Sequence, residues 1–248
     1  MSQNQEQAAR GTPELSVVIP IYNERRNIGP LLEEVKVALG GESYEVIVVD
    51  DGSTDGSASE LAGLKESFSA LRIISLGRRS GQSAALVAGF DAARGTVLVT
   101  MDGDGQNDPG DIPSLLRILR EKPDCAGVVG YRKNRVDSNW RRFQSRVANG
   151  VRDIITGDSV RDTGCSLKAI RAHHVSRLPR FDGMHRFLPT LLRALRFEVA
   201  EVPVSHRPRR YGRSKYGMWG RVFWAVRDAF GVRWLVRRAL PKVDAKES

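Results

Sequence analysis

The 248-residue chain has two cysteines, four histidines and no run of about 20 apolar residues. Cys125 and Cys165 are too few for a disulfide framework and lack metal-ligand spacing, which favours a reducing, cytosolic location. The scattered histidines do not indicate a metal site, and the missing apolar run predicts no transmembrane helix. Residues 1–13 are mostly polar, so we expect a disordered tail and not a signal peptide.

Positive charge is what the chain has in excess, with a formal net charge of +10 at pH 7. Between Ser205 and Arg238 there are ten Lys or Arg residues and one acid, so this segment alone carries +9. Such a block indicates an anionic partner: nucleic acid, a membrane surface or a phosphorylated substrate. A solvated basic face would have the same composition, so both interpretations stay open at this point.

Short β-branched runs alternate with helical patterns through the first half of the chain. This alternation predicts an α/β fold, a mostly parallel sheet flanked by helices, whose near-continuous apolar strands are buried on both faces. The expected strands are Leu15–Pro20, Tyr44–Val49, Leu71–Leu76, Thr96–Met101, Ala126–Gly130, Gly164–Ile170 and Phe197–Val204. The expected helices are Glu24–Leu39, one from about Asp55, Ser80–Ala93, Pro109–Arg120 and Asn139–Ile155. We expect one domain over 14–215, an amphipathic helix over 216–240 and a tail over 241–248.

Acidic residues follow two of these strands directly. Asp50 and Asp51 end the second strand, and Asp102 and Asp104 follow the fourth, with Gln106 just beyond. Ligands of open parallel sheets bind beyond the carboxyl ends of the strands, so we expect these loops to converge. Helix capping explains a single Asp in such a turn, and we assign that role to Asp55.

The second loop offers oxygen ligands on a tight, glycine-rich turn. Mg²⁺ or Mn²⁺ takes such ligands together with substrate phosphates, and would neutralise a diphosphate leaving group. The sequence therefore predicts a metal site at Asp102, Asp104 and Gln106. An acidic turn solvated at the surface is the alternative.

Three runs together resemble family 2 glycosyltransferases with the GT-A fold: Val-Val-Ile-Pro-Ile-Tyr-Asn-Glu, Val-Val-Asp-Asp-Gly-Ser-Thr-Asp and Met-Asp-Gly-Asp-Gly-Gln. The Asp-x-Asp-x-Gln pattern followed by Pro resembles the polyprenyl-phosphate branch, which includes dolichol-phosphate mannose synthase and bacterial undecaprenyl-phosphate sugar transferases. The resemblance covers roughly Leu15 to Gly217 and implies a GT-A domain over 14–215. It also implies a nucleotide-sugar donor.

The resemblance implies roles on the donor side. Asp50 would support its turn. The donor would contact the following residues: Pro20, Tyr22, Glu24, Asp51, Arg79, Asp102, Arg209 and Ser214. The metal ligands would be Asp102, Asp104 and Gln106, and the Arg-x-x-Gly-x-Ser-Lys-Tyr loop that ends in Lys215 and Tyr216 would fold over the diphosphate as a lid.

On the acceptor side, a phosphate oxygen is already anionic near pH 7 and needs cationic positioning in place of a general base. By resemblance, the acceptor-phosphate residues are Arg132, Arg142 and Ser145, and the His185-Arg186-Phe187-Leu188-Pro189 run lies near the acceptor site. Asp162 would touch sugar hydroxyls or orient an acceptor-side arginine. A base role for Asp162 would imply a hydroxyl acceptor. The expected catalytic residues are thus Asp104, Arg132, Asp162 and Lys215.

From Trp219 onward, apolar residues recur at helical spacing with arginines between them. The pattern is typical of a helix that lies among lipid headgroups, and equally of a helix packed on the protein's own core. We therefore expect a peripheral enzyme on the cytoplasmic face of the membrane, with a membrane-protein partner or a homo-oligomer as further options.

The leading hypothesis is inverting, metal-dependent transfer of a sugar from a UDP- or GDP-sugar to a polyprenyl phosphate. A close alternative has a hydroxyl of a glycan or glycolipid as the acceptor. A basic nucleic-acid-binding module is a remote alternative without a supporting motif, so we expect no nucleic-acid partner. An inactive scaffold disagrees with the complete set of acidic and basic motifs.

Overall fold

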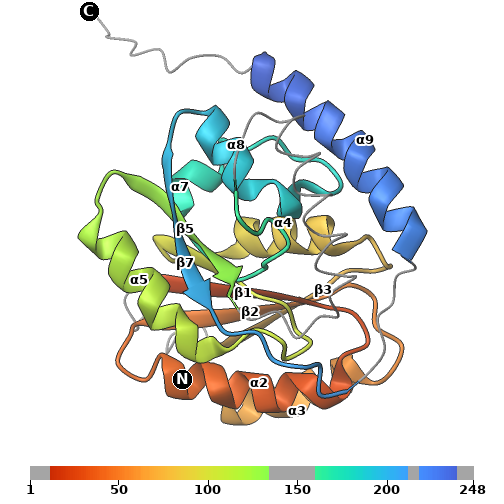
Figure 1. Cartoon of the computed structure of the whole chain (residues 1–248). Coiled ribbons are helices and arrows are strands. Elements are labelled where there is room, and N and C mark those ends of the chain that lie inside the picture. Colours follow the sequence, from red (N-terminus) through yellow and green to blue (C-terminus); the bar gives the residue numbers. More distant parts are fainter. Residues whose placement is uncertain (1–11, 134–159, 212–217, 239–248) are drawn as a thin grey trace, which may run out of the picture.

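A computed structural model describes residues 12–133, 160–211 and 218–238 of the chain (Figure 1). Each strand and helix expected within these ranges is present, with ends that differ by a few residues. The strands are β1 (Leu15–Ile21), β2 (Tyr44–Asp50), β3 (Leu71–Ser75), β4 (Val97–Thr100), β5 (Cys125–Arg132), β6 (Lys168–Arg171) and β7 (Glu198–Val204). The expected helix Asn139–Ile155 lies outside the described residues.

The helices connect these strands and cover the sheet. They are α2 (Arg25–Ala38), α3 (Ser57–Ser67), α4 (Gln82–Ala92), α5 (Ile112–Glu121), α7 (Ala172–Val175), α8 (Leu188–Ala194) and α9 (Met218–Arg237), with 3₁₀ turns η1 (Pro109–Asp111) and η2 (Met184–Arg186). The expected helix Pro109–Arg120 begins with the tighter turn η1, because the Asp108 side chain accepts the backbone N–H of Gly110 at 2.9 Å.

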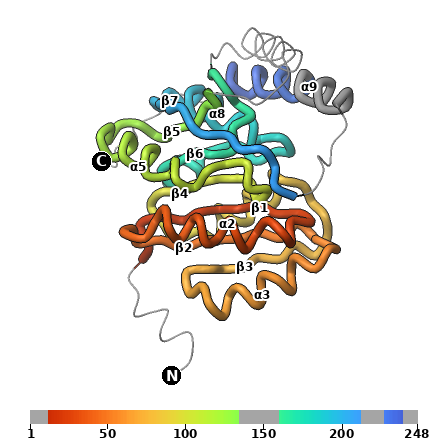
Figure 2. The backbone as a smooth tube through the Cα atoms, turned by 60° about the horizontal axis from the view of Figure 1, so that its bottom comes forward, coloured from red at the N-terminus to blue at the C-terminus, as the bar shows by residue number. Residues whose placement is uncertain are grey.

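One seven-stranded sheet has the order β3-β2-β1-β4-β6-β5-β7, which can be followed in Figure 2. Neighbouring strands run parallel except where β6 pairs with β4 and β5, to both of which it is antiparallel. The sheet is therefore mostly parallel, as the sequence predicted. The insertion of β6 brings residues near 162–168 beside the end of β4.

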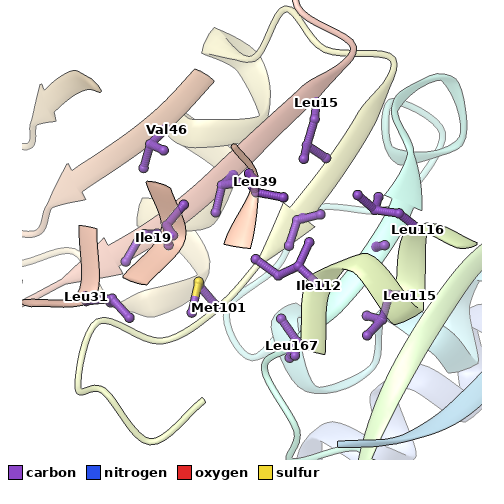
Figure 3. Packing of buried hydrophobic residues seen from close by; sticks show 14 of the residues in the cluster. Leu15, Ile19, Leu31, Leu39, Val46, Met101, Ile112, Leu115, Leu116 and Leu167 are labelled. Atoms are coloured by element: carbon purple, nitrogen blue, oxygen red, sulfur yellow. The ribbon is translucent and has the colours of Figure 1, made fainter. Parts of the chain in front are cut away.

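Each face of the sheet buries its own layer of apolar side chains. Val17 and Ile19 of β1 point to the layer formed with α2 and α5, part of which is shown in Figure 3. Val18, the residue between them, packs with α4 on the opposite face. This alternation leaves β1 buried on both faces, as its continuous apolar run requires. The helices thereby hold the carboxyl ends of β1, β2 and β4 in one place.

A third cluster joins α8 and α9 to the same face as α4. Ala229 and Val232 of α9 are 1% and 0% exposed and pack in this cluster with residues of α8. Figure 1 shows α9 along the outer side of α8. The C-terminal half of α9 is thus part of the folded domain, and this packing determines which of its faces remains open.

Candidate active site

A cleft of about 980 Å³ lies at the carboxyl ends of β1 and β4. Pro20 and Asp102 line it, together with residues of the 80–82 and 182–186 segments and with Lys168. The segments are far apart in sequence, and the sheet order brings them together. Of the predicted site residues, Pro20 and Asp102 line this cleft directly.

In the first acidic loop, Asp50 and Asp51 accept hydrogen bonds from backbone N–H groups. Asp50 accepts the backbone N–H of Ser53 at 2.9 Å, so it supports its turn as expected. The two carboxylate oxygens of Asp51 accept the backbone N–H groups of Ser80 at 2.5 Å and Gly81 at 2.9 Å. Gly52 has φ +71°, and a Cβ there would lie 2.8 Å from the backbone nitrogen of Arg79. The loop therefore orders the approach to α4, and a contact of Asp51 with the nucleotide stays a prediction.

Asp55, which was predicted to cap a helix, connects two helix starts. Its Oδ1 accepts the backbone N–H of Ser57, the first residue of α3, at 3.0 Å. Its Oδ2 accepts the backbone N–H of Arg25, the first residue of α2, at 3.1 Å. Both bonds use N–H groups that a helix itself leaves unpaired. Burial opposes and these hydrogen bonds favour the ionised form, with the net result that the pKa of Asp55 lies below its ordinary value.

Asp102, the first acid of the second loop, is anchored on two sides. Its Oδ1 accepts Nε2 of Gln82 at 2.8 Å, and its backbone N–H donates to Oδ1 of Asn107 at 3.1 Å. The hydroxyl of Ser166 also donates to that oxygen of Asn107, at 2.6 Å. Gln82, Asn107 and Ser166 were not predicted as site residues, because nothing in their local sequence reveals these long-range contacts. Burial, followed by the negative charge of Asp104, raises the pKa of Asp102.

Asp104, the second acid, is 8% exposed and uses both oxygens. Oδ1 accepts the backbone N–H of Gln106 at 3.1 Å, and Oδ2 accepts Nη2 of Arg209 at 2.6 Å. The Gly103 backbone between the two acids lies against β1, where a Cβ would come within 2.5 Å of Ile21. Glycine at this position therefore lets the acidic turn sit on the end of the first strand.

The donor set suits a hard divalent cation. The negative charge of Asp104 disfavours the ionised form of Asp102, a repulsion that a bound cation would relieve. No group of three His, Cys, Asp or Glu side chains forms a cation cage within the described ranges. Two carboxylates and an amide, completed by substrate phosphates and water, are what Mg²⁺ or Mn²⁺ accepts. The residues predicted for the metal therefore fit it.

Arg209 lies over the acidic turn as part of the segment that follows β7. Its Nη1 is 3.2 Å from Oε1 of Glu24, and its Nη2 forms the 2.6 Å contact with Asp104. The guanidinium of Arg209 thus joins Glu24 and Asp104, and all three residues were predicted on the donor side. Tyr22 and Arg79, two more residues predicted there, also meet, with the guanidinium carbon 4.3 Å from the ring centroid.

Two further arginines fix the same segment to α2. Arg207 pairs with Glu34 at 2.7 Å and with Asp108 at 2.5 Å. Arg210 pairs with the other oxygen of Glu34, also at 2.7 Å. These ion pairs tie residues 207–210 to α2 and to Asp108, so the segment stays next to the acidic turn that Arg209 contacts. The remaining lid residues, Ser214 and Lys215, lie outside the described residues.

Arg132 and Asp162 form a tight pair, and Arg132 is near enough to act on the charge of Asp102. Nε of Arg132 is 2.6 Å from Oδ2 of Asp162, and Nη2 is 2.9 Å from Oδ1. The backbone N–H of Arg132 reaches the same carboxylate at 3.3 Å. A bidentate contact of this kind fixes the plane of the guanidinium. The other predicted acceptor residues, Arg142 and Ser145, lie outside the described residues.

Lys168 is a buried cation that the sequence did not reveal as part of the site. It is 3% exposed, and its ammonium group donates to the backbone carbonyl of Cys165. Burial lowers its pKa, while the nearby carboxylates of Asp102 and Asp162 favour the charged form. Lys168 lines the cleft, and Arg132 is near enough to act on its charge.

The described part of α9 has two different faces. Ala229 and Val232 are buried, whereas Phe230 and Trp234 are each 58% exposed. The guanidinium carbon of Arg238 lies 5.2 Å from the ring centroid of Trp234. The buried face packs on the protein's own core, which is one of the two sequence interpretations, and a membrane contact of the exposed face stays a prediction. In the described part of the chain, no helix has the length and hydropathy needed to cross a membrane.

Comparisons with known proteins give matches over most of the chain. The model of the family Glycosyl transferase family 2 matches residues 16–178. The dodecaprenyl-phosphate galacturonate synthase of Rhizobium johnstonii is 42% identical over 232 residues, which are 90% of this chain and 68% of that protein. The undecaprenyl-phosphate 4-deoxy-4-formamido-L-arabinose transferase of Serratia proteamaculans is 38% identical over 207 residues, 82% of this chain and 63% of that protein. The chain thus spans about two thirds of the length of these relatives.

Solved structures show the same architecture. Glucosyl-3-phosphoglycerate synthase from Mycobacterium tuberculosis, in complex with Mn²⁺, uridine diphosphate and glucosyl-3-phosphoglycerate, superposes with a TM-score of 0.67. The identity is 20%, and the match covers 98% of this chain and 86% of the other. At this identity the likeness concerns the fold, which is the GT-A fold expected from the sequence motifs.

Proposed function

Because the chain belongs to glycosyl transferase family 2 and is a glycosyltransferase, we propose that it transfers a sugar from a nucleotide-sugar to a polyprenyl phosphate. The names of its two relatives each contain a polyprenyl phosphate. The observation that carries the proposal is the cleft lined by Asp102 and Lys168, with Asp104 and Arg132 near enough to act on the charge of Asp102. Each side suits one of the two substrates.

The donor side is the acidic turn with its covering arginine. Asp102, Asp104 and Gln106 would hold Mg²⁺ or Mn²⁺, and this cation would supply charge neutralisation to the departing diphosphate. Arg209, which binds Asp104 at 2.6 Å in the described state, is close enough to contact the diphosphate instead. Pro20, Tyr22, Glu24, Asp51 and Arg79, with Ser214 beyond the described ranges, complete the proposed donor site.

The acceptor side favours a phosphate over a hydroxyl. A hydroxyl acceptor needs a base, and Asp162 is the candidate that the sequence offers. Both oxygens of Asp162 are bound by Arg132, at 2.6 and 2.9 Å, so the carboxylate is already engaged in holding the guanidinium. An ionised phosphate oxygen has no proton to remove. We therefore assign Asp162 to positioning the guanidinium of Arg132, which holds the acceptor.

The reaction that this arrangement supports is a single displacement. A phosphate oxygen of the acceptor attacks the anomeric carbon of the donor, and the bond from that carbon to the diphosphate oxygen breaks. The electron pair leaves with the nucleoside diphosphate, and the configuration at the carbon inverts. Lys215, with Arg142 and Ser145 near the acceptor, is proposed from the motif alone.

The open face of α9 supports a peripheral position at the cytoplasmic face of the membrane. Phe230 and Trp234 are separated by one helical turn and project from the side opposite Ala229 and Val232. Aromatic side chains flanked by arginine are typical of helices that lie among anionic lipid headgroups. Such a position would bring a lipid-linked acceptor to the protein.

A donor panel tests the proposed function. UDP- and GDP-sugars are incubated with the full chain, Mn²⁺ or Mg²⁺ and a short polyprenyl phosphate, and the lipid-linked product is quantified. We expect metal-dependent product from at least one donor. Parallel reactions contain a glycan or glycolipid with free hydroxyls and no lipid phosphate. Product that forms only in these reactions would refute the polyprenyl-phosphate acceptor.

A further inference from the structure

His185 contacts α4 across more than a hundred residues of sequence. It lies in η2, and its Nδ1 is 2.7 Å from the hydroxyl oxygen of Ser83 in the first turn of α4. The same hydroxyl oxygen accepts the backbone N–H of Gly183 at 2.9 Å. Ser83 is 4% exposed, so its hydroxyl proton requires a partner inside the protein. One buried hydroxyl therefore connects the helix to the segment that carries the histidine.

This arrangement defines the proton positions on the imidazole. Within the described residues, the hydroxyl of Ser83 has His185 Nδ1 as its available acceptor, because its contact with Gly183 uses the oxygen as acceptor. Nδ1 therefore accepts, and the neutral ring carries its proton on Nε2. Burial, aided by the positive charges of Arg186 and Lys168, lowers the pKa of His185 to about 3. The ring stays neutral throughout the physiological range.

The Nε2 atom of His185 opens into the cleft. His185 lines the cleft, and its Nε2 makes no hydrogen bond within the described residues. Nε2 is also not sealed from solvent. Because Ser83 holds the ring at Nδ1, the Nε2–H of this cleft-lining residue has a fixed direction. The neutral N–H suits a hydroxyl oxygen.

Asp182 lines the same wall and adds an acceptor. Its carboxylate makes no hydrogen bond or ion pair with the described part of the chain, and a Cβ on Gly81 would lie 3.9 Å from it. Asp228 also lines this wall, 3.9 Å from Arg186 and 3.8 Å from Arg227. A neutral donor beside an uncompensated carboxylate disfavours a phosphate and suits hydroxyl groups, which both donate and accept.

We propose that His185 is a specificity-determining residue that donates from Nε2 to a hydroxyl of the transferred sugar, with Asp182 accepting from a hydroxyl of the same sugar. The inference rests on the proposed function, since it places the donor's sugar in the cleft. A polyprenyl phosphate has no hydroxyl apart from its phosphate group, so the sugar is the substrate part that matches this wall. The acceptor phosphate then lies toward Arg132 and Lys168, where the positive charge is.

The test separates sugar binding from nucleotide binding. Calorimetric titrations with Mn²⁺ present compare UDP or GDP with the nucleotide-sugar that the wild type uses. His185→Phe is expected to weaken nucleotide-sugar binding by roughly 3- to 30-fold, the effect of leaving a sugar hydroxyl unpaired, with the affinity for the free nucleoside diphosphate unchanged. His185→Gln, which restores an N–H donor, should recover part of the loss. His174→Phe, at a half-buried histidine outside the cleft, is the matched control.

A second readout distinguishes binding from proton transfer. The pH profile of kcat/KM should keep its shape between pH 5.5 and 9 in His185→Gln, because the wild-type ring is neutral throughout that range. Loss of one limb of the profile, equal weakening of free nucleotide and nucleotide-sugar, or unchanged sugar affinity in His185→Phe would each overturn the assignment. A wild-type protein that binds no nucleotide-sugar would instead refute the proposed function, which distinguishes the two failures.

Discussion

Removal of the Arg209 guanidinium should affect metal affinity and turnover in opposite directions. In the described state Arg209 bridges Asp104, at 2.6 Å, and Glu24, at 3.2 Å. A divalent cation that binds Asp104 must compete with this guanidinium. Arg209→Ala leaves the carboxylate open, so we expect Mn²⁺ to bind more tightly when no nucleotide is present.

The magnitude follows from the geometry and exposure of the pair. The side chains of Arg209 and Asp104 are 24% and 11% exposed, so the contact is neither free in solvent nor fully buried. A hydrogen bond between charged groups contributes about 1.5–3 kcal/mol net. If Mn²⁺ must break this contact, its dissociation constant should fall by roughly 10- to 150-fold in Arg209→Ala. Turnover should fall in the same variant, because the diphosphate loses a cation.

Calorimetric titration of the nucleotide-free protein with Mn²⁺ measures the first effect, and product formation from the active donor measures the second. Arg210→Ala is the matched control, because Arg210 pairs with Glu34 and makes no described contact with the acidic turn. It should leave the affinity for Mn²⁺ near that of the wild type. Equal or weaker Mn²⁺ binding by Arg209→Ala would refute the competition between guanidinium and metal.

Three more perturbations test other parts of the site. Asp104→Ala should abolish turnover, measured as lipid-linked product, because it removes a proposed metal ligand; retained activity would contradict the metal role. Asp162→Asn should raise the KM for polyprenyl phosphate by about tenfold with little change in the donor KM, since one weakened charged hydrogen bond to Arg132 is worth about 1.4 kcal/mol; a rise confined to the donor KM would argue against acceptor binding. His185 has a pKa of about 3 in the folded protein, below its ordinary 6.5, so the unfolded chain takes up its proton first as pH falls below 6.5. Between pH 7.5 and pH 5, the free energy of unfolding measured with urea should therefore fall by about 2 kcal/mol more for wild type than for His185→Gln. Equal falls would mean that the ring is not held neutral.

The sheet was predictable because its strands are recognisable one at a time. The runs that form β1, β2 and β4 are nearly continuous apolar segments, and burial on both faces follows from that composition. Acids that follow such strands must lie at one edge of a parallel sheet. The convergence of the acidic loops at one end therefore required no knowledge of tertiary contacts.

The contacts that complete the site depended on topology. β6 runs antiparallel between β4 and β5, and this placement brings Ser166 to Asn107 and Lys168 toward Asp102. Likewise, Ser83 and His185 are a hundred residues apart and meet because η2 packs on α4. Local sequence has no periodicity that signals such pairings. The arginines were predicted as cations, whereas their carboxylate partners could be assigned only from the folded chain.

The two arginines flanking the acidic turn are held in ways that predict different behaviour on substrate binding. Arg132 ends β5, and the carboxylate of Asp162 holds both its guanidinium and its backbone N–H. Arg209 belongs to a connecting segment, and its partner Asp104 is itself a proposed metal ligand. A cation and a diphosphate would remove one partner from Arg209 and supply another, whereas Arg132 can keep its bidentate contact with Asp162. Donor binding should therefore rearrange the segment around Arg209, and acceptor binding should find its arginine already in place.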